Sequence, residues 1–112
     1  MKPPIAYDDF SKIDIRVGTV IDASVFEKAR KPAYILTIDF GELGVMKSSA
    51  QITDYYEPSS LIGRQVIAVV NFPPKQIANI QSQCLVLGAV EEDGKVILLS
   101  PEKACDNGLR IA

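Results

Sequence analysis

The side chains of this chain that could do chemistry are mostly hydrogen-bond donors and acceptors. They gather between residues 47 and 89, where two apolar runs, Gln65–Val70 and Leu85–Ala89, bracket a polar connection. Apart from Lys75, the polar residues of that connection are uncharged amides and hydroxyls. Such groups recognise a polar surface well and are weak acids, bases and nucleophiles. The segment therefore indicates recognition rather than catalysis.

The residues that are absent or scarce narrow the chemistry further. The chain has no histidine, which removes Ser-His-Asp and Cys-His nucleophiles and every metal site that needs histidine. The two cysteines, Cys84 and Cys105, are too few for a four-thiolate zinc site or a disulfide framework. Neither GxxxxGK[ST] nor GxGxxG occurs. We expect a protein that is not an enzyme and that holds no metal or cofactor.

Basic and small polar residues are placed as an RNA-binding surface would need them. Bases cluster in a loop between two expected strands, and small hydroxyls at the end of another strand would let a sugar-phosphate backbone approach. Glutamine supplies the paired donor and acceptor that a base edge needs. A solvated charged turn is the alternative for the loop bases. The predicted RNA-binding residues are Lys28, Arg30, Lys31, Lys47, Ser49, Gln51, Asn71, Lys75, Ser82 and Gln83.

Apolar residues near the same surface give a second prediction. An exposed apolar patch would suit an extended polypeptide. The predicted peptide-binding residues are Phe26, Ile52, Phe72, Ile77 and Ile80. Phe26 and Phe72 are also the better candidates for stacking on RNA bases, because Tyr34, Tyr55 and Tyr56 are more typical of core and helix packing.

Composition sets the class of protein. A length of 112 residues with 47% hydrophobic residues predicts one globular domain, residues 1–112. The net charge of −2 gives no strong general attraction to nucleic acid, although bases exceed acids between residues 28 and 75 and acids exceed bases between 91 and 106. No apolar run is long enough for a membrane span, and the N-terminus has no apolar leader. We therefore expect a cytoplasmic protein.

Hydrophobic periodicity predicts the elements that position these residues. Alternation from Ile13 to Ile21 marks a half-buried strand, in which Gly18 suggests a bulge or sharp coil. A helical turn is expected at 7–12, a helix at 54–61 ending at Gly63, and a hairpin turn at Glu91–Gly94. Further strands are expected at 34–40, 45–50, 65–70, 85–90 and 96–99.

The order of these elements predicts an all-β fold. Three strands, a short helix and then further strands fit a five-stranded Greek-key barrel of the OB type, with the helix capping the barrel between strands three and four and with N- and C-terminal extensions. An SH3-like barrel or half a sandwich fits the strand count alone, and the helix position favours OB. In OB barrels the loops after strands one and four flank the ligand groove. Lys28–Lys31 and Lys75 would then lie on two edges of one groove.

Several separated motifs closely resemble the tRNA-binding domain family: Phe10–Gly18, Leu61–Val66, Val70–Lys75 and Ser82-Gln83. The resemblance extends from about Phe10 to Ile111, and the segments 47–53, 71–78 and 85–88 look most like its CsaA subfamily of small export-related, chaperone-like proteins. It implies a homodimer of OB barrels joined through the N- and C-terminal segments. It also implies binding of tRNA or other structured RNA and, for CsaA-like members, of unfolded or exported polypeptides in protein secretion. Relatives commonly have glycine at the position of Asn79, so we expect Asn79 to take a left-handed backbone conformation.

Overall fold

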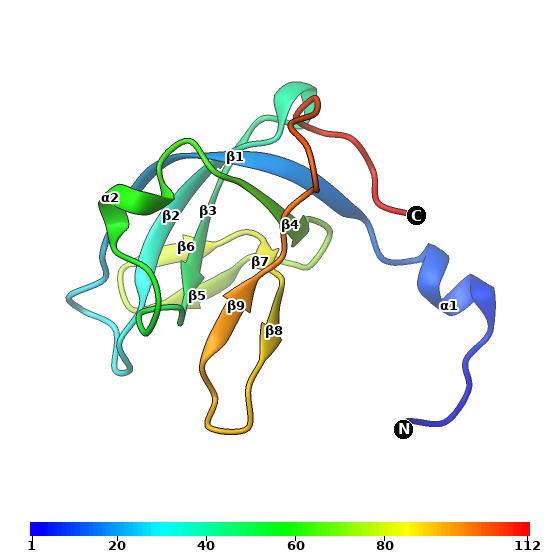
Figure 1. Ribbon diagram of the computed structural model, residues 1–112, viewed down its shortest axis with the longest axis horizontal. Coiled ribbons are helices and arrows are strands. Elements are labelled where there is room, and N and C mark those ends of the chain that lie inside the picture. The colour runs from blue at the N-terminus through cyan, green and yellow to red at the C-terminus, as the bar shows by residue number, and fades with distance from the viewer.

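The structure, a computed structural model, describes residues 1–112 and is built around one curled antiparallel sheet (Figure 1). The sheet has five strands in the order β3-β2-β1-β4-β7. Two small hairpins, β5–β6 and β8–β9, extend from it. The strands are β1 (Ile15–Val25), β2 (Tyr34–Asp39), β3 (Val45–Ala50), β4 (Gln65–Val69), β5 (Lys75–Ile77), β6 (Ile80–Ser82), β7 (Leu85–Val86), β8 (Gly88–Val90) and β9 (Val96–Leu98). A 3-10 turn, η1 (Gly41–Leu43), joins β2 to β3.

Strand β1 is long because it pairs with two different strands along its length. Its first half pairs with β4, from Ile15 to Thr19, and its second half pairs with β2 as far as Val25. The register shifts between Val20 and Asp22, which is a bulge that bends the strand from one partner to the other. The strand therefore contains a bulge, but it lies at Val20–Asp22 rather than at Gly18. Gly18 is needed for close packing instead, since a Cβ there would lie 2.6 Å from Ile38 Cγ2.

The barrel interior is one cluster of eleven buried residues. Strand β2 supplies it by strict alternation, and Leu61 from the single-turn helix α2 (Pro58–Leu61) is fully buried against it. Helix α2 lies between β3 and β4, which confirms the predicted all-β OB-type barrel with a capping helix. The helix begins four residues later than predicted, at Pro58, where the fixed φ of proline favours the first helical position.

Hydrogen bonds between β3 and the segment before β7 nearly close the barrel. The Gln83 amide N–H donates to the Lys47 carbonyl at 2.8 Å, and the Lys47 amide N–H donates to Gln83 Oε1 at 2.9 Å. Ser48 Oγ, which is buried, donates to the Cys84 carbonyl at 2.9 Å. The predicted 71–83 connection thus contains the β5–β6 hairpin, and the predicted strand 85–90 is split at Leu87, where β8 leaves the barrel to pair with β9.

The two ends of the chain differ. The N-terminal arm, residues 1–14, carries α1 (Tyr7–Ser11) away from the barrel, and no residue of α1 is buried (Figure 1). The C-terminal tail, residues 99–112, returns to β1, where Gly108 N–H donates to the Val17 carbonyl at 2.7 Å. Val17 N–H in turn donates to the Leu109 carbonyl at 3.0 Å. None of the helices has the length and apolar character needed to cross a membrane.

Candidate nucleic-acid interface

A groove of about 940 Å³ lies between the β1–β2 loop, the end of β3 and the β5–β6 hairpin. Predicted RNA-binding residues from all three segments line it: Lys28, Arg30, Lys31, Ser49, Gln51 and Lys75. Residues far apart in sequence are therefore brought to one surface by the barrel. Gln76 and Ala78 line the same groove and were missed, because the hairpin that carries them had been expected to be an irregular connection.

The basic side chains of the β1–β2 loop are exposed because the two ends of the loop are anchored to the barrel. The Phe26 amide N–H donates to the Ala33 carbonyl at 2.9 Å, and both side chains are buried. The side chains of Lys28, Arg30 and Lys31 between them are exposed. The burial of Phe26, which is 4% exposed, corrects the prediction that it forms part of the surface.

The groove carries uncompensated positive charge. Lys28, Arg30, Lys31 and Lys75, called the groove bases below, line it with no Asp or Glu among the lining residues. None of the groove bases forms an ion pair, whereas Arg16 pairs with Asp14 at 2.6 Å. With Ser49 and Gln51 as neutral donors, the groove can hold a chain of phosphates.

The remaining predicted RNA-binding residues have contacts within the fold. Ser82 Oγ accepts a hydrogen bond from the Ser49 amide at 3.1 Å, and Gln83 binds the Lys47 backbone. Asn71 ties the arm to the barrel: its Oδ1 accepts from the Asp14 amide at 2.9 Å and its Nδ2 donates to the Lys12 carbonyl at 2.8 Å. The Lys47 side chain is exposed, but it does not line the groove.

The predicted peptide-binding residues are dispersed. Ile52 is 4% exposed and belongs to the core, so its expected place at the surface was wrong. Ile77 lines the groove and pairs across the hairpin with the half-buried Ile80. Phe72 is 54% exposed but lies outside the groove lining.

The tip of the β5–β6 hairpin has an unusual backbone. Ala78, with φ of 48°, is the single non-glycine residue with positive φ, and it lines the groove. The left-handed residue is therefore Ala78 rather than the predicted Asn79. The alanine side chain forms no hydrogen bond that would offset the energetic cost of this conformation, so the tip of the hairpin stores some strain.

Tyrosines brace the loop between β3 and α2 beside the groove. Tyr34 Oη donates to the Tyr56 carbonyl at 2.6 Å, and Tyr56 Oη accepts from the Leu98 amide at 2.9 Å. Burial, and then the nearby Glu57, raises the pKa of Tyr34. The hydrogen bond to Glu91 raises the pKa of Tyr55 to about 12, and burial raises the pKa of Cys84 to about 11. None of these titrating groups lines the groove.

Residues 15–110 match the family described as the putative tRNA binding domain. Among curated proteins, the chain is 38% identical over 107 residues to the methionine–tRNA ligase of Methanococcoides burtonii, covering 96% of this chain and 16% of the ligase. It is 38% identical over 103 residues to the ligase of Flavobacterium psychrophilum, covering 92% of this chain and 15% of that one. The chain thus spans a small part of the length of these relatives.

Solved structures match over nearly the whole chain. The crystal structure of the chaperone CsaA from Bacillus anthracis has a TM-score of 0.94 and 52% identity, covering 98% of this chain and 100% of that one. The CsaA chaperone protein from Picrophilus torridus has a TM-score of 0.90 and 55% identity, covering 97% and 100%. With this family match and these likenesses, the chain belongs to the tRNA-binding domain family, as a CsaA-type member.

Proposed function

We propose that this chain is a non-catalytic RNA-binding module that holds the phosphate backbone of tRNA or another structured RNA in its groove. The observation that carries the proposal is the set of groove bases, which line one groove without any acid among them and without an ion pair. Lysine and arginine in such a position gain affinity by releasing the counterions of the phosphates. The family match supports RNA as the polyanion.

The composition of the groove favours a backbone ligand over unpaired bases. Proteins that bind single strands stack the bases on aromatic side chains. No aromatic residue lines this groove, since Phe26 and Tyr34 are buried in the barrel. Ser49 and Gln51 add neutral hydrogen bonds that suit phosphate and ribose oxygens. The net charge of −2 predicts modest affinity that is lost readily in salt.

A salt titration of tRNA binding tests the proposal. We expect the double variant Arg30→Ala/Lys31→Ala to bind more weakly and the slope of log affinity against log salt to fall by about two. The control is Lys2→Ala/Lys103→Ala, which removes the same charge from outside the groove. No tRNA binding at low salt, or equal losses in both variants, would contradict the proposal.

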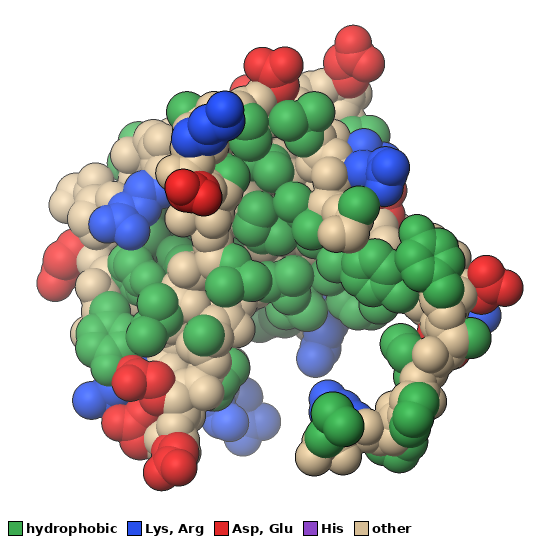
Figure 2. All heavy atoms as spheres, turned by 45° about the vertical axis from the view of Figure 1, so that its right-hand side comes forward, with side chains coloured by type: hydrophobic (Ala, Val, Ile, Leu, Met, Phe, Trp, Pro, Cys, Tyr) green, Lys and Arg blue, Asp and Glu red, His purple; other side chains and the backbone are tan.

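We further propose that the module is a homodimer joined through the N-terminal arm. Helices as short as α1 are unstable alone in water, so an isolated one needs a partner surface. Ile5 and Tyr7 are 71% and 75% exposed, and Ile97 of β9 and Leu99 just after it are also exposed. Hydrophobic side chains spread over the face beside the arm, with a hollow between arm and barrel (Figure 2). A second copy of the arm is the occupant that this surface fits.

A second candidate function is binding of unfolded or exported polypeptides. It is favoured by the 52% and 55% identity to proteins described as CsaA chaperones and by the apolar side chain of Ile77 within the groove. Suppression of the aggregation of an unfolded client protein tests it, with Ile77→Ser as the variant and Ile21→Ser, at an exposed isoleucine outside the groove, as the control. A chain that leaves client aggregation unchanged would exclude this function.

A further inference from the structure

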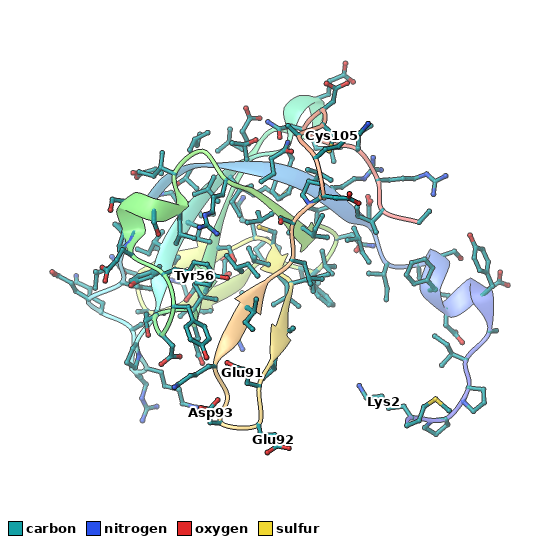
Figure 3. All side chains as sticks on the ribbon, in the orientation of Figure 1. Lys2, Tyr56, Glu91, Glu92, Asp93 and Cys105 are labelled. Atoms are coloured by element: carbon teal, nitrogen blue, oxygen red, sulfur yellow. The ribbon has the colours of Figure 1, made fainter.

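The β8–β9 hairpin ends in a concentration of negative charge. Its turn contains Glu91, Glu92 and Asp93, called the acidic tip below, and all three are exposed (Figure 3). The turn is shaped by its own hydrogen bonds, in which Gly94 N–H donates to the Glu91 carbonyl and Glu91 N–H donates to the Lys95 carbonyl, each at 2.8 Å. The hairpin projects from the barrel, so the tip is available to another molecule (Figure 1).

The charge of the acidic tip is only partly compensated within the chain. Asp93 pairs with Lys95 at 3.5 Å, and Glu91 accepts a hydrogen bond from the neutral Tyr55 hydroxyl. Glu92 forms neither an ion pair nor a side-chain hydrogen bond. The groove bases are likewise unpaired, so the molecule has an open positive surface and an open negative surface.

These two surfaces are neighbours. The loop between β3 and α2 begins at Gln51, which lines the groove, and reaches Tyr55, whose hydroxyl donates to Glu91 of the acidic tip. The backbone from Gln51 to Tyr55 spans at most about 14 Å, so this short loop connects the groove to the residue that contacts the acidic tip. No ion pair joins them within one molecule. Adjacent patches of opposite charge are self-complementary under a two-fold rotation, because each patch then meets its opposite on the partner.

We propose that the acidic tip of one copy docks into the basic groove of a second copy, and reciprocally, so that the protein occludes its own groove. The contact is made of exposed charge pairs, which are individually weak and screened by salt, and it is therefore reversible. The self-association stands on the charges alone. The consequence that RNA must displace the tip rests on the proposed function.

The first test is self-association without RNA, measured by sedimentation velocity at about 20 mM and about 200 mM salt, between which screening shortens from roughly 20 Å to less than 10 Å. We expect a larger species at low salt that returns to the high-salt mass, with at least about a tenfold weaker association at the higher salt. An arm-mediated apolar contact would persist at high salt, so the two associations are separable. The same mass at both salt concentrations would overturn the proposal.

Charge exchange gives the sharper test. Arg30→Glu/Lys31→Glu alone and Glu92→Lys/Asp93→Asn alone should each lose the low-salt species, because the first cancels the net charge of the groove bases and the second cancels that of the acidic tip. An equal mixture of the two variants should regain part of it, since the unaltered groove of one variant meets the unaltered tip of the other, and in the second contact the introduced acids face the introduced lysine. The matched control is Glu102→Lys/Asp106→Asn, which makes the same charge change in the exposed tail and should behave as the unaltered protein. A mixture that stays dissociated, or a control that also loses the species, would overturn the proposal.

Competition with tRNA then connects the tip to the function. At low salt tRNA should dissolve the self-associated species, and Glu92→Lys/Asp93→Asn should bind tRNA at least about threefold more tightly than the control variant. If the charge-exchange result holds and tRNA does not bind, the proposed RNA function fails alone. If tRNA binds and no self-association occurs, the docking proposal fails alone.

Discussion

The two terminal segments lie near each other in the fold and are held in opposite ways. The tail is fixed to β1 by backbone hydrogen bonds, including Ile111 N–H to the Ile15 carbonyl at 2.8 Å, and Arg16 donates to the Gly108 carbonyl at 3.0 Å. The hydrogen bonds between the arm and the barrel lie at the base of the arm, where Asn71 binds Lys12 and Asp14 and the Val70 amide N–H donates to the Asp14 carbonyl at 2.8 Å. The tail covers an edge of β1 that would otherwise expose unpaired backbone groups. The tail therefore completes the barrel, whereas the arm leaves its own side chains exposed to a partner.

The largest effect is expected where the tail passes closest to the barrel. Gly108 has φ of 92°, and a Cβ there would lie 2.6 Å from the Phe40 carbonyl oxygen. Gly108→Ala should lower the free energy of unfolding by about 3 kcal/mol, measured by urea titration. Gly94 has φ of 90° with nothing within 4 Å, so Gly94→Ala should lose only about 1 kcal/mol. Equal losses in the two variants would mean that the tail does not press on Phe40.

The next effect concerns the side-chain contacts of the tail. Asn107 Oδ1 accepts from Thr19 Oγ1 at 2.7 Å and from Gln65 Nε2 at 3.1 Å. Asn107→Leu should lower the free energy of unfolding by about 2 kcal/mol, because it leaves partly buried donors unpaired. Adding Thr19→Val should cost less in this background than in the unaltered protein. Full additivity in the denaturation data would show that the Thr19 contact contributes nothing.

A smaller effect is expected at the base of the arm. Asn71→Ala removes the hydrogen bonds to the Asp14 amide and the Lys12 carbonyl, which should lower the free energy of unfolding by about 1 kcal/mol. Affinity for tRNA should stay as it is, since Asn71 does not line the groove. Loss of tRNA affinity with unchanged stability would show that Asn71 belongs to the RNA-binding surface, as the sequence predicted.

The smallest effect on the barrel itself should come from removing the arm. Deletion of residues 1–9 takes away no buried residue, so the monomer should change in stability by less than about 0.5 kcal/mol. The mass in solution should nevertheless fall to that of a monomer. The dependence of the unfolding midpoint on protein concentration should disappear with it. If the deletion lowered the free energy of unfolding by several kcal/mol in dilute solution, the arm would stabilise the barrel as the tail does, and the two segments would not differ.

The sequence predicts the barrel well because its signals are local. Alternation along β2 and the position of α2 after β3 are enough to select the fold, and the loop bases with Lys75 select the groove. The roles of Asn71 and Gln83 are not predictable in this way. An amide satisfies a backbone group or a nucleic-acid base equally well, and the choice depends on partners 57 and 36 residues away. The prediction that Phe26 lies at the surface was wrong for a similar reason. Its burial depends on how the charged loop folds back at Ala33.

The pairing of the tail with β1 also has a consequence for the order of synthesis. Thr19 and Asn107 are 88 residues apart, so the edge of β1, which is the first strand of the barrel to be synthesised, is covered only after residue 107 has emerged. Contacts this distant in sequence form slowly, and a nascent chain folds from its N-terminus. During translation the barrel therefore carries an open edge, and a chain that stalls before Asn107 presents β1 to whatever strand it meets first.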